Sequence, residues 1–223
     1  MIRAERLRLT IDGRAILDDV SFEIARGESV ALVGPNGSGK TSVLRCLLGL
    51  VPFVGRARIG GHDVVRAPIA ARTLVGYVPQ KVAFGDARAG EVLAFVARVR
   101  GLADEGIAGA LRGVGLEAHA NEPVRTFSGG MQQRLGIALA LLGDPPVVLL
   151  DEPSASLDRE GQDAFFALVG RLRASSHTLL LASHRSEEVA SLTDRVLHLD
   201  RGRITSPSGN TRVIPLAARR ERR

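Results

Sequence analysis

The stretch SVALVGPNGSGKTSVLRCLLGL, residues 29–50, constrains the fold more than any other part of the sequence. An apolar, strand-like run leads into a glycine-rich turn, and a helical pattern follows. The turn fits the pattern G-x-x-x-x-G-K-[ST], in which glycines let backbone N–H groups converge on phosphate and the helix adds its N-terminal dipole. We therefore predict a nucleotide-binding phosphate loop formed by Gly34, Pro35, Asn36, Gly37, Ser38, Gly39, Lys40, Thr41 and Ser42.

The same pattern assigns roles to individual side chains. Lys40 is expected to reach the β- and γ-phosphates, and Thr41 to ligate Mg²⁺. The stretch VVLLDE, residues 147–152, predicts a buried strand that brings Asp151 to the magnesium side of the phosphates. Glu152 follows at the strand tip, where a carboxylate orients and deprotonates the attacking water. Exposed strand ends often carry acids, so it is the phosphate loop that favours this interpretation.

Two polar residues follow other apolar strands. His184 closes the run TLLLAS, and because parallel strands end at one edge of a sheet, it is expected near the phosphate loop, donating to the γ-phosphate. Gln80 follows LVGYVP and either ligates Mg²⁺ or sits in a loop. A single histidine is more often a surface or core residue, and that interpretation is kept for the other four, His62, His119, His177 and His198.

Hydrophobic periodicity predicts an α/β fold with a mainly parallel sheet. Residues 1–26 give short alternating segments that indicate an N-terminal antiparallel β-subdomain. From about residue 85 to 143 the period becomes helical, which predicts an α-helical subdomain inserted between sheet strands. Its stripes are expected to face the core, one of them formed by Val92, Phe95, Val96 and Val99 and another by Ile107, Leu111 and Val114.

Length, cysteine content and charge set further bounds. The 223 residues, 45% of them hydrophobic, suffice for one large domain, here 1–206, followed by a basic tail at 207–223. The single cysteine, Cys46, excludes a disulfide framework and a cysteine-only metal cluster. Residues 212–223 hold five arginines and one glutamate, which is +4 of the net charge of +6. The nearly balanced remainder argues against a nucleic-acid partner, and the tail is either solvated or touches an anionic lipid or nucleic acid.

The stretch TFSGGMQQR, residues 126–134, provides a second candidate phosphate cradle. Its serine and two glycines, Ser128, Gly129 and Gly130, open a helical pattern. One small domain has no evident need for two such cradles.

FSGGMQQR between a phosphate loop and LLDEP, followed by SASLD and LASH, resembles the ATP-binding-cassette (ABC) ATPase family over almost the whole chain. The resemblance implies the P-loop ABC ATPase fold, ATP and Mg²⁺ as cofactors, and ATP hydrolysis. In this family two cassettes pack head to tail, and the signature of each covers the γ-phosphate held by its partner. The second cradle would therefore serve the partner's ATP.

Family roles carry over to matching residues. Gln80 falls at the glutamine loop, which touches Mg²⁺ and senses the membrane partner. Asp158 falls at the dimer-contact loop after Glu152, and His184 falls at the switch histidine. Glu152, His184 and Gln80 are thus the expected catalytic residues, and Thr41, Gln80 and Asp151 the expected metal-site residues.

Three departures from the family pattern stand out. Ile11 occupies the position of the aromatic residue that stacks on adenine. Ser156 replaces a glycine or alanine in the dimer-contact loop. Phe127 and Met131 replace the usual ends of the signature, and we expect them to change the surface of the helical subdomain without removing the groups that face phosphate.

The resemblance also implies partners. No run approaches the ~18 apolar residues that cross a bilayer, and the N-terminus resembles no signal peptide. We therefore expect a cytoplasmic subunit, peripheral on the membrane through a separate transmembrane permease, and dimeric with itself or with a related ATPase. The pattern around the signature is closest to exporter-type cassettes. A cassette that drives a membrane complex without transport is the alternative, and a nucleic-acid or ribosome-associated ATPase a weaker one.

Overall fold

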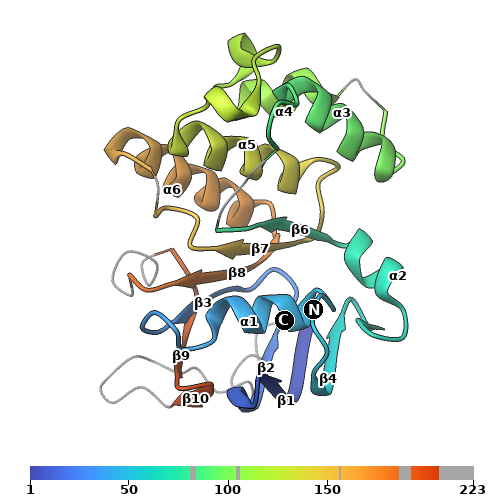
Figure 1. Cartoon of the computed structure of the whole chain (residues 1–223), viewed down its shortest axis with the longest axis vertical. Helices are drawn as coiled ribbons and strands as arrows, with labels where there is room; N and C mark the ends of the chain where they lie inside the picture. The colour runs from blue at the N-terminus through green and yellow to red at the C-terminus, as the bar shows by residue number, and fades with distance from the viewer. Residues whose placement is uncertain (81–83, 104–105, 156, 186–191, 206–223) are drawn as a thin grey trace, which may run out of the picture.

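The computed structural model describes residues 1–80, 84–103, 106–155, 157–185 and 192–205. Ser156 and the basic tail at 207–223 lie outside the described residues. Within the described part, the strands form a four-stranded sheet in the order β2-β1-β4-β5 and a six-stranded sheet in the order β10-β9-β3-β8-β7-β6 (Figure 1).

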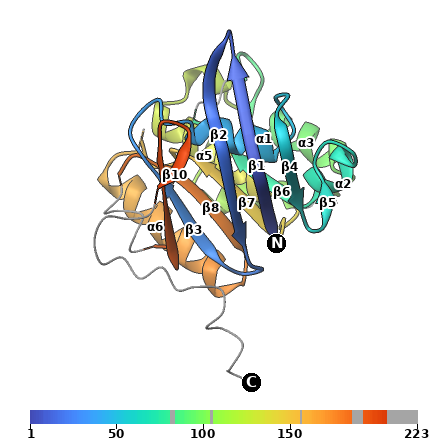
Figure 2. The same cartoon turned by 90° about the horizontal axis from the view of Figure 1, so that it is seen from below.

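The four-stranded sheet is antiparallel throughout, and its edge strand β2 lies beside β10 of the six-stranded sheet (Figure 2). Its long first hairpin has an irregularity between Ala4 and Leu7, where Arg6 has φ 49°. The irregularity explains why both Ala4 and Leu7 are buried although they are three positions apart. The strands are β1 (Ile2–Ile11), β2 (Arg14–Ile24), β4 (Val54–Ile59) and β5 (His62–Asp63).

The six-stranded sheet is parallel from β9 to β6, and only its edge strand β10 runs antiparallel, to β9. The central strands are buried on both faces, as expected for a parallel sheet covered by helices. The strands are β3 (Ser29–Val33), β6 (Val75–Val78), β7 (Val147–Asp151), β8 (Thr178–Ser183), β9 (Arg195–Asp200) and β10 (Arg203–Thr205).

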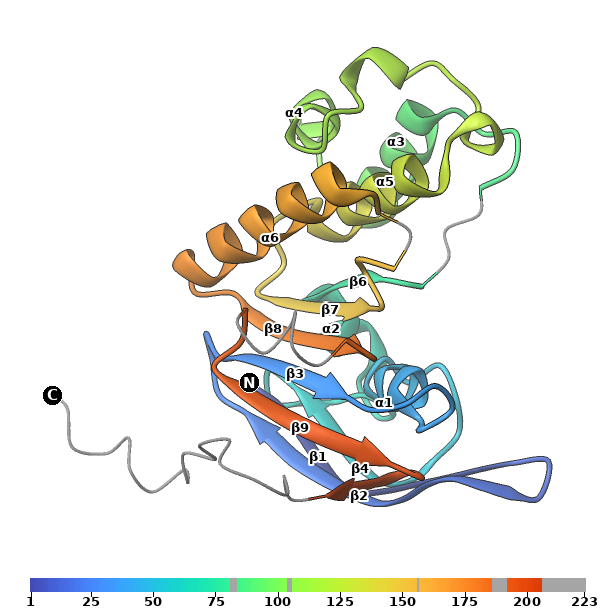
Figure 3. The same cartoon turned by 90° about the vertical axis from the view of Figure 1, so that its left-hand side faces the viewer.

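Helices cover both faces of this sheet (Figure 3). Helix α1 packs between one face and the antiparallel strands, whereas α5 and α6 cover the other face. Helices α3, α4 and α5 lie between β6 and β7 in the chain and share a third core cluster. The helices are α1 (Lys40–Leu47), α2 (Pro68–Thr73), α3 (Ala89–Val99), α4 (Gly106–Gly113), α5 (Gly129–Leu141) and α6 (Arg159–Ala174).

The predicted α/β fold, with an antiparallel N-terminal sheet and a helical insertion, is therefore confirmed. The prediction that the first stripe of the insertion faces the core was wrong in part. Phe95 is 61% exposed and Val99 is 70% exposed, while α3 buries Leu93 and Ala97 instead. The cause is tertiary, because α3 contacts α4 and α5 through the face that carries Leu93. Periodicity gives the helix but not the direction from which its neighbours approach.

Gly76 on β6 provides a test of how α5 packs on the sheet. A Cβ at this position would lie 2.1 Å from the carbonyl O of Ala140 and 2.9 Å from Cγ of Pro145. Gly76→Ala is therefore expected to lower the melting temperature by about 3–10 °C, because overpacking costs ~1–3 kcal/mol. The matched control is Gly109→Ala on α4, where a Cβ meets nothing within 4 Å. If both variants melt like the parent, α5 does not approach β6 as described.

Candidate functional site

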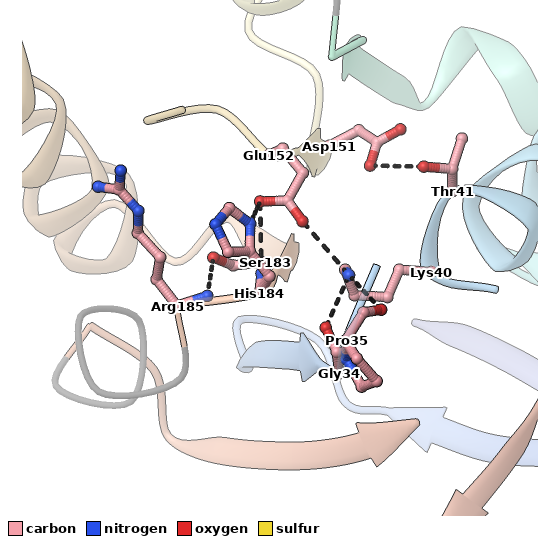
Figure 4. Close-up of polar contacts among 9 residues, drawn as sticks. All are labelled: Gly34, Pro35, Lys40, Thr41, Asp151, Glu152, Ser183, His184 and Arg185. Carbon is pink, nitrogen blue, oxygen red and sulfur yellow. Dashed lines mark hydrogen bonds and ion pairs between the residues drawn. The ribbon is translucent and has the colours of Figure 1, made fainter. Parts of the chain in front are cut away.

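The site forms where the carboxyl ends of three parallel strands meet. In the sheet β8 lies between β3 and β7, although it follows both in sequence. The phosphate loop follows β3, Glu152 follows β7 and His184 follows β8, so one sheet edge carries all three (Figure 4). Neighbouring strands are ~4.8 Å apart, so a side chain from the loop after β3 has to reach past β8 to meet Glu152.

The phosphate loop is built so that only glycine fits at its ends. A Cβ on Gly34 would lie 2.1 Å from the carbonyl O of Leu199, and Gly39 has φ 106°. The backbone N–H of Gly202 donates to the carbonyl O of Ser38 at 3.0 Å, which ties the loop to the β9–β10 turn. Ser38 is 4% exposed, and its Oγ has no hydrogen-bond partner among the described residues. This orphaned hydroxyl and the turn of glycines fit a bound phosphate group.

Lys40, the first residue of α1, is held by three groups of its own chain. Its Nζ donates to the carbonyl oxygens of Gly34 at 2.8 Å and Pro35 at 3.2 Å. It also lies 3.3 Å from Oε1 of Glu152, with side-chain exposures of 6% and 7% for the two residues. A phosphate that binds this ammonium therefore has to compete with Glu152.

The second oxygen of Glu152 contacts His184. Oε2 lies 2.8 Å from Nδ1 of His184 and accepts the backbone N–H of the same residue at 3.3 Å. Glu152 has φ 49°, a conformation that costs a non-glycine residue ~1–3 kcal/mol and persists only where surrounding contacts fix it. Its backbone N–H donates to the carbonyl O of Ala182 at 2.9 Å. The carboxylate is thus held between Lys40 and His184 (Figure 4).

Asp151 is buried at the end of β7 and receives hydroxyl donors on both oxygens. Thr41 Oγ1 donates to Oδ1 at 3.0 Å, and the Tyr77 hydroxyl lies 3.5 Å from Oδ2. Burial is the largest cause that raises the pKa of Asp151, opposed by the Thr41 hydrogen bond. Burial and the charge of Asp151 raise the pKa of Tyr77 to about 12, so its hydroxyl is a proton donor at neutral pH. Thr41 and Asp151 are the pair that would hold Mg²⁺, whose ligands in nucleotide sites are few and include substrate phosphates.

A cleft of about 400 Å³ opens over the phosphate loop. Gln80 and Glu152 line it together with the loop, and Gln80 is exposed there. His184 is absent from the lining and contacts Glu152 from the side. The lining consists of Ile16, Asn36, Gly37, Gly39, Lys40, Thr41, Ser42, Gln80 and Glu152.

The cleft includes an apolar residue that sequence reasoning missed. Ile11, the expected base-stacking position, ends β1 opposite Arg14, is 43% exposed and is not among the lining residues. Ile16 of β2 lines the cleft instead, and its carbonyl O lies 3.1 Å from where a Cβ of Gly39 would be. The number of residues before the phosphate loop does not show which strand of the β1–β2 hairpin faces the cleft, so it could not decide between Ile11 and Ile16. The available signal was the isoleucine that follows the Asp12-Gly13 turn on the second strand of the hairpin.

The serine and glycines of FSGGMQQR begin α5. Ser128 caps this helix, its Oγ accepting the backbone N–H of Met131 at 3.2 Å. Phe127 is 5% exposed and packs edge-on to His119 with ring centroids 6.2 Å apart, so the expected surface change at Phe127 is wrong. Met131 packs partly buried in the same helical cluster. Both departures therefore affect the core of the insertion rather than the groups at the helix start.

A second cavity, of about 810 Å³, lies between the beginnings of α5 and α6 and the end of α4. Ser128, Gly129 and Gly130 line it, as does Asp158, which caps α6 through a hydrogen bond from the Gly161 N–H at 2.9 Å. The described linings of the two cavities have no residue in common. Within one chain, the signature thus does not face the phosphate loop.

Comparison with known proteins agrees with this geometry. The profile of the ABC transporter family matches residues 17–155, more than half of the chain. The linearmycin resistance ATP-binding protein LnrL of Bacillus subtilis is 34% identical over 91% of this chain and 67% of its own length. The zinc import ATP-binding protein ZnuC of Pseudomonas putida is 37% identical over 90% of this chain and 75% of its own.

Among solved structures, an ATP-binding subunit of an ABC transporter superposes with a TM-score of 0.85 at 28% identity, covering 92% of this chain and 88% of that one. The chain belongs to the ABC transporter ATPases. As a member it is an ATP-binding subunit that hydrolyses ATP. Cassettes of this family dimerise and pair with transmembrane subunits, and no helix among the described residues is long and apolar enough to cross a membrane.

The base-reading region leads to the first prediction on nucleotide binding. An aliphatic side chain offers less than the ~1–3 kcal/mol of an aromatic stack, so we expect ATP and GTP to compete within about tenfold of each other. Ile16→Ala should weaken binding of both nucleotides by about 3–10-fold, and Ile11→Ala should have the smaller effect. Competition binding with a fluorescent nucleotide measures both. Strong ATP preference would mean that another residue reads the base, and a larger effect of Ile11→Ala would restore Ile11 to that role.

Proposed function

We propose that this protein is the ATP-hydrolysing subunit of an ABC exporter, which dimerises head to tail on ATP and drives a separate transmembrane permease. The observation that carries the proposal is the separation of the two cavities. A chain whose phosphate loop and signature open into different spaces completes each nucleotide site only with a second chain. The partner is another copy or a related ATPase subunit.

Nucleotide binding rests on the phosphate loop and on Asp151. Lys40 and the loop N–H groups would neutralise and orient the phosphates, while Thr41, Asp151 and Gln80 would hold Mg²⁺. When bound, Mg²⁺ supplies charge neutralisation of the phosphate oxygens. The remaining chemistry belongs to side chains of this protein.

Glu152 is the proposed general base. It lines the nucleotide cleft and has His184 on one oxygen at 2.8 Å and Lys40 at 3.3 Å from the other. A phosphate that takes Lys40 leaves Glu152 with His184 as its remaining charged or polar partner in this cluster. His184 then orients the carboxylate from beside the cleft, where its side chain is 41% exposed.

The helical insertion offers the permease a surface. Phe95 and Val99 on α3 and Phe84 before it are large apolar residues with 61%, 70% and 39% exposure. Gln80 lies two residues after β6, before the chain continues to this insertion, and it lines the nucleotide cleft, so it would link the cleft to that surface. Through such a permease the protein would lie at the cytoplasmic face of the membrane. No nucleic-acid partner is proposed.

The direction of transport is the finer part of the proposal. Similarity to the Nod factor export ATP-binding protein I of Ralstonia nicotianae, 36% identical over 91% of this chain and 65% of its own length, supports export, whereas similarity to a zinc import protein supports the alternative. A cassette that drives a membrane complex without moving a solute is a further candidate. A permease that copurifies with this protein would identify the partner. The complex in inverted vesicles tests the direction: ATP-dependent uptake into them supports export, and uptake into right-side-out vesicles contradicts it.

Removal of the base tests the catalytic assignment. Glu152→Gln keeps the shape of the side chain and loses its basicity, so turnover should fall by ~10²–10⁴-fold while ATP still binds. The matched control is Glu117→Gln, at an exposed pair with Arg112 on the helical insertion, which should hydrolyse ATP like the parent. Steady-state phosphate release and equilibrium ATP binding measure the two effects. A Glu152→Gln variant with parental turnover would exclude Glu152 as the base.

Complementation tests the shared site. In a homodimer, each site takes Lys40 from one chain and Ser128 from the other. Mixing a Lys40→Ala chain with a Ser128→Arg chain places both defects in one site and leaves the other site intact. With Glu152→Gln added to both chains to slow hydrolysis, the mixture should dimerise with ATP where neither variant does alone.

The readout is light scattering or analytical ultracentrifugation, and differently tagged chains report that subunits exchange. If the signature served the ATP of its own chain, every site would carry one defect and mixing would restore nothing. Equal behaviour of all three samples, with exchange demonstrated, would therefore contradict the head-to-tail arrangement.

A further inference from the structure

Tyr77, the only tyrosine of the chain, lies next to the proposed metal site without belonging to the phosphate loop or the signature. It is on β6, which pairs with β7 so that Tyr77 is opposite Leu149. Side chains two residues apart on a strand share a face, so Leu149, Asp151 and Tyr77 all point to the side of the sheet that α1 covers. This register brings the phenol beside the carboxylate.

The ring and the hydroxyl of Tyr77 have different surroundings. The ring packs, partly buried, against the core cluster beneath α1. The hydroxyl lies 3.5 Å from Oδ2 of Asp151, longer than the usual ~2.5–3.0 Å, so it is a weak donor to this oxygen. Packing of the ring therefore fixes where the hydroxyl can go, and the hydroxyl in turn restrains the carboxylate.

Thr41 and Tyr77 hold opposite oxygens of Asp151. Thr41 comes from the first turn of α1 and takes Oδ1 at 3.0 Å, while Tyr77 approaches from β6 on the other side. A carboxylate held on one oxygen can still rotate about its last bond, whereas donors on both oxygens fix its plane. Asp151 is 1% exposed, so water cannot replace the Tyr77 hydroxyl as a hydrogen-bond donor to Oδ2.

We propose that Tyr77 is a positioning residue for the Mg²⁺ site. Its hydroxyl orients the Asp151 carboxylate so that Oδ1, the oxygen beside Thr41, is presented to the metal. The inference rests on the proposed role of Thr41 and Asp151. Tyr77 itself touches neither metal nor nucleotide. Its effect is confined to the metal-dependent part of nucleotide binding.

Tyr77→Phe tests this role, because it keeps the ring and removes the hydroxyl. A net hydrogen bond is worth roughly a factor of 3–10 in an equilibrium constant, so the Mg²⁺ concentration for half-maximal effect should rise by about 3–10-fold. The readout is ATP binding followed by fluorescence while Mg²⁺ is titrated, with the same measurement in EDTA. Binding in EDTA should equal that of the parent, while the melting temperature of the apo protein should fall by only about 1–6 °C, because the buried Oδ2 loses one donor.

Two control variants separate the possible failures. Thr73→Val removes a hydroxyl that bonds the Ile69 carbonyl on the exposed surface of α2 and should leave the titration unchanged. Thr41→Val removes the proposed metal ligand and should shift the titration more than Tyr77→Phe does. If Thr41→Val has no effect, the metal site itself is misassigned.

If Thr41→Val shifts the Mg²⁺ titration and Tyr77→Phe does not, the positioning role of Tyr77 is overturned while the site stands. Equal loss of ATP binding with and without Mg²⁺ in Tyr77→Phe would also overturn it, because that pattern indicates a general structural role. A shift confined to the Mg²⁺ titration supports the proposal.

Discussion

The ion pair between Lys40 and Glu152 is the interaction on which the nucleotide site depends. Both side chains are more than nine-tenths buried, and a buried charge is costly unless it is paired and hydrogen-bonded. The pair spans the end of β8, because the chain inserts this later strand between the two that carry the phosphate loop and the base. Topology thus brings His184 to the one place where it can hold the remaining oxygen of Glu152.

A buried cluster of this kind couples binding to chemistry. Lys40 donates hydrogen bonds to the carbonyl oxygens of Gly34 and Pro35 and pairs with Oε1 of Glu152. A nucleotide phosphate that binds Lys40 therefore has to offer stronger contacts than these. The glycine turn and the α1 N-terminus supply the additional attraction. The strained backbone of Glu152 is maintained by its neighbours on β8, which keeps the carboxylate in place when Lys40 is taken.

Sequence was sufficient wherever function depends on local pattern. Gly34 to Thr41, Asp151 and Glu152 were predictable because strand, turn and helix follow one another directly in the chain. Ile16, Tyr77 and the orientation of Phe95 were not, since each depends on which element packs against another. Tyr77 reaches Asp151 only through the pairing of β6 with β7, and 74 positions separate the two residues. Such a contact leaves no trace in local periodicity.

The two cradles of this chain differ in kind, and the difference argues that they are complementary. The phosphate loop carries a cation, Lys40, and its own metal ligands, whereas the start of α5 offers a serine and two glycines, with Arg134 of the same helix also lining their cavity. The hydroxyl of Ser128 already accepts a hydrogen bond from its own helix, and the first turn of any helix leaves N–H groups without intrahelical partners. Those donors attract a phosphate weakly by themselves. They become effective against a phosphate that Lys40 of another chain already holds, which makes the second chain part of the site.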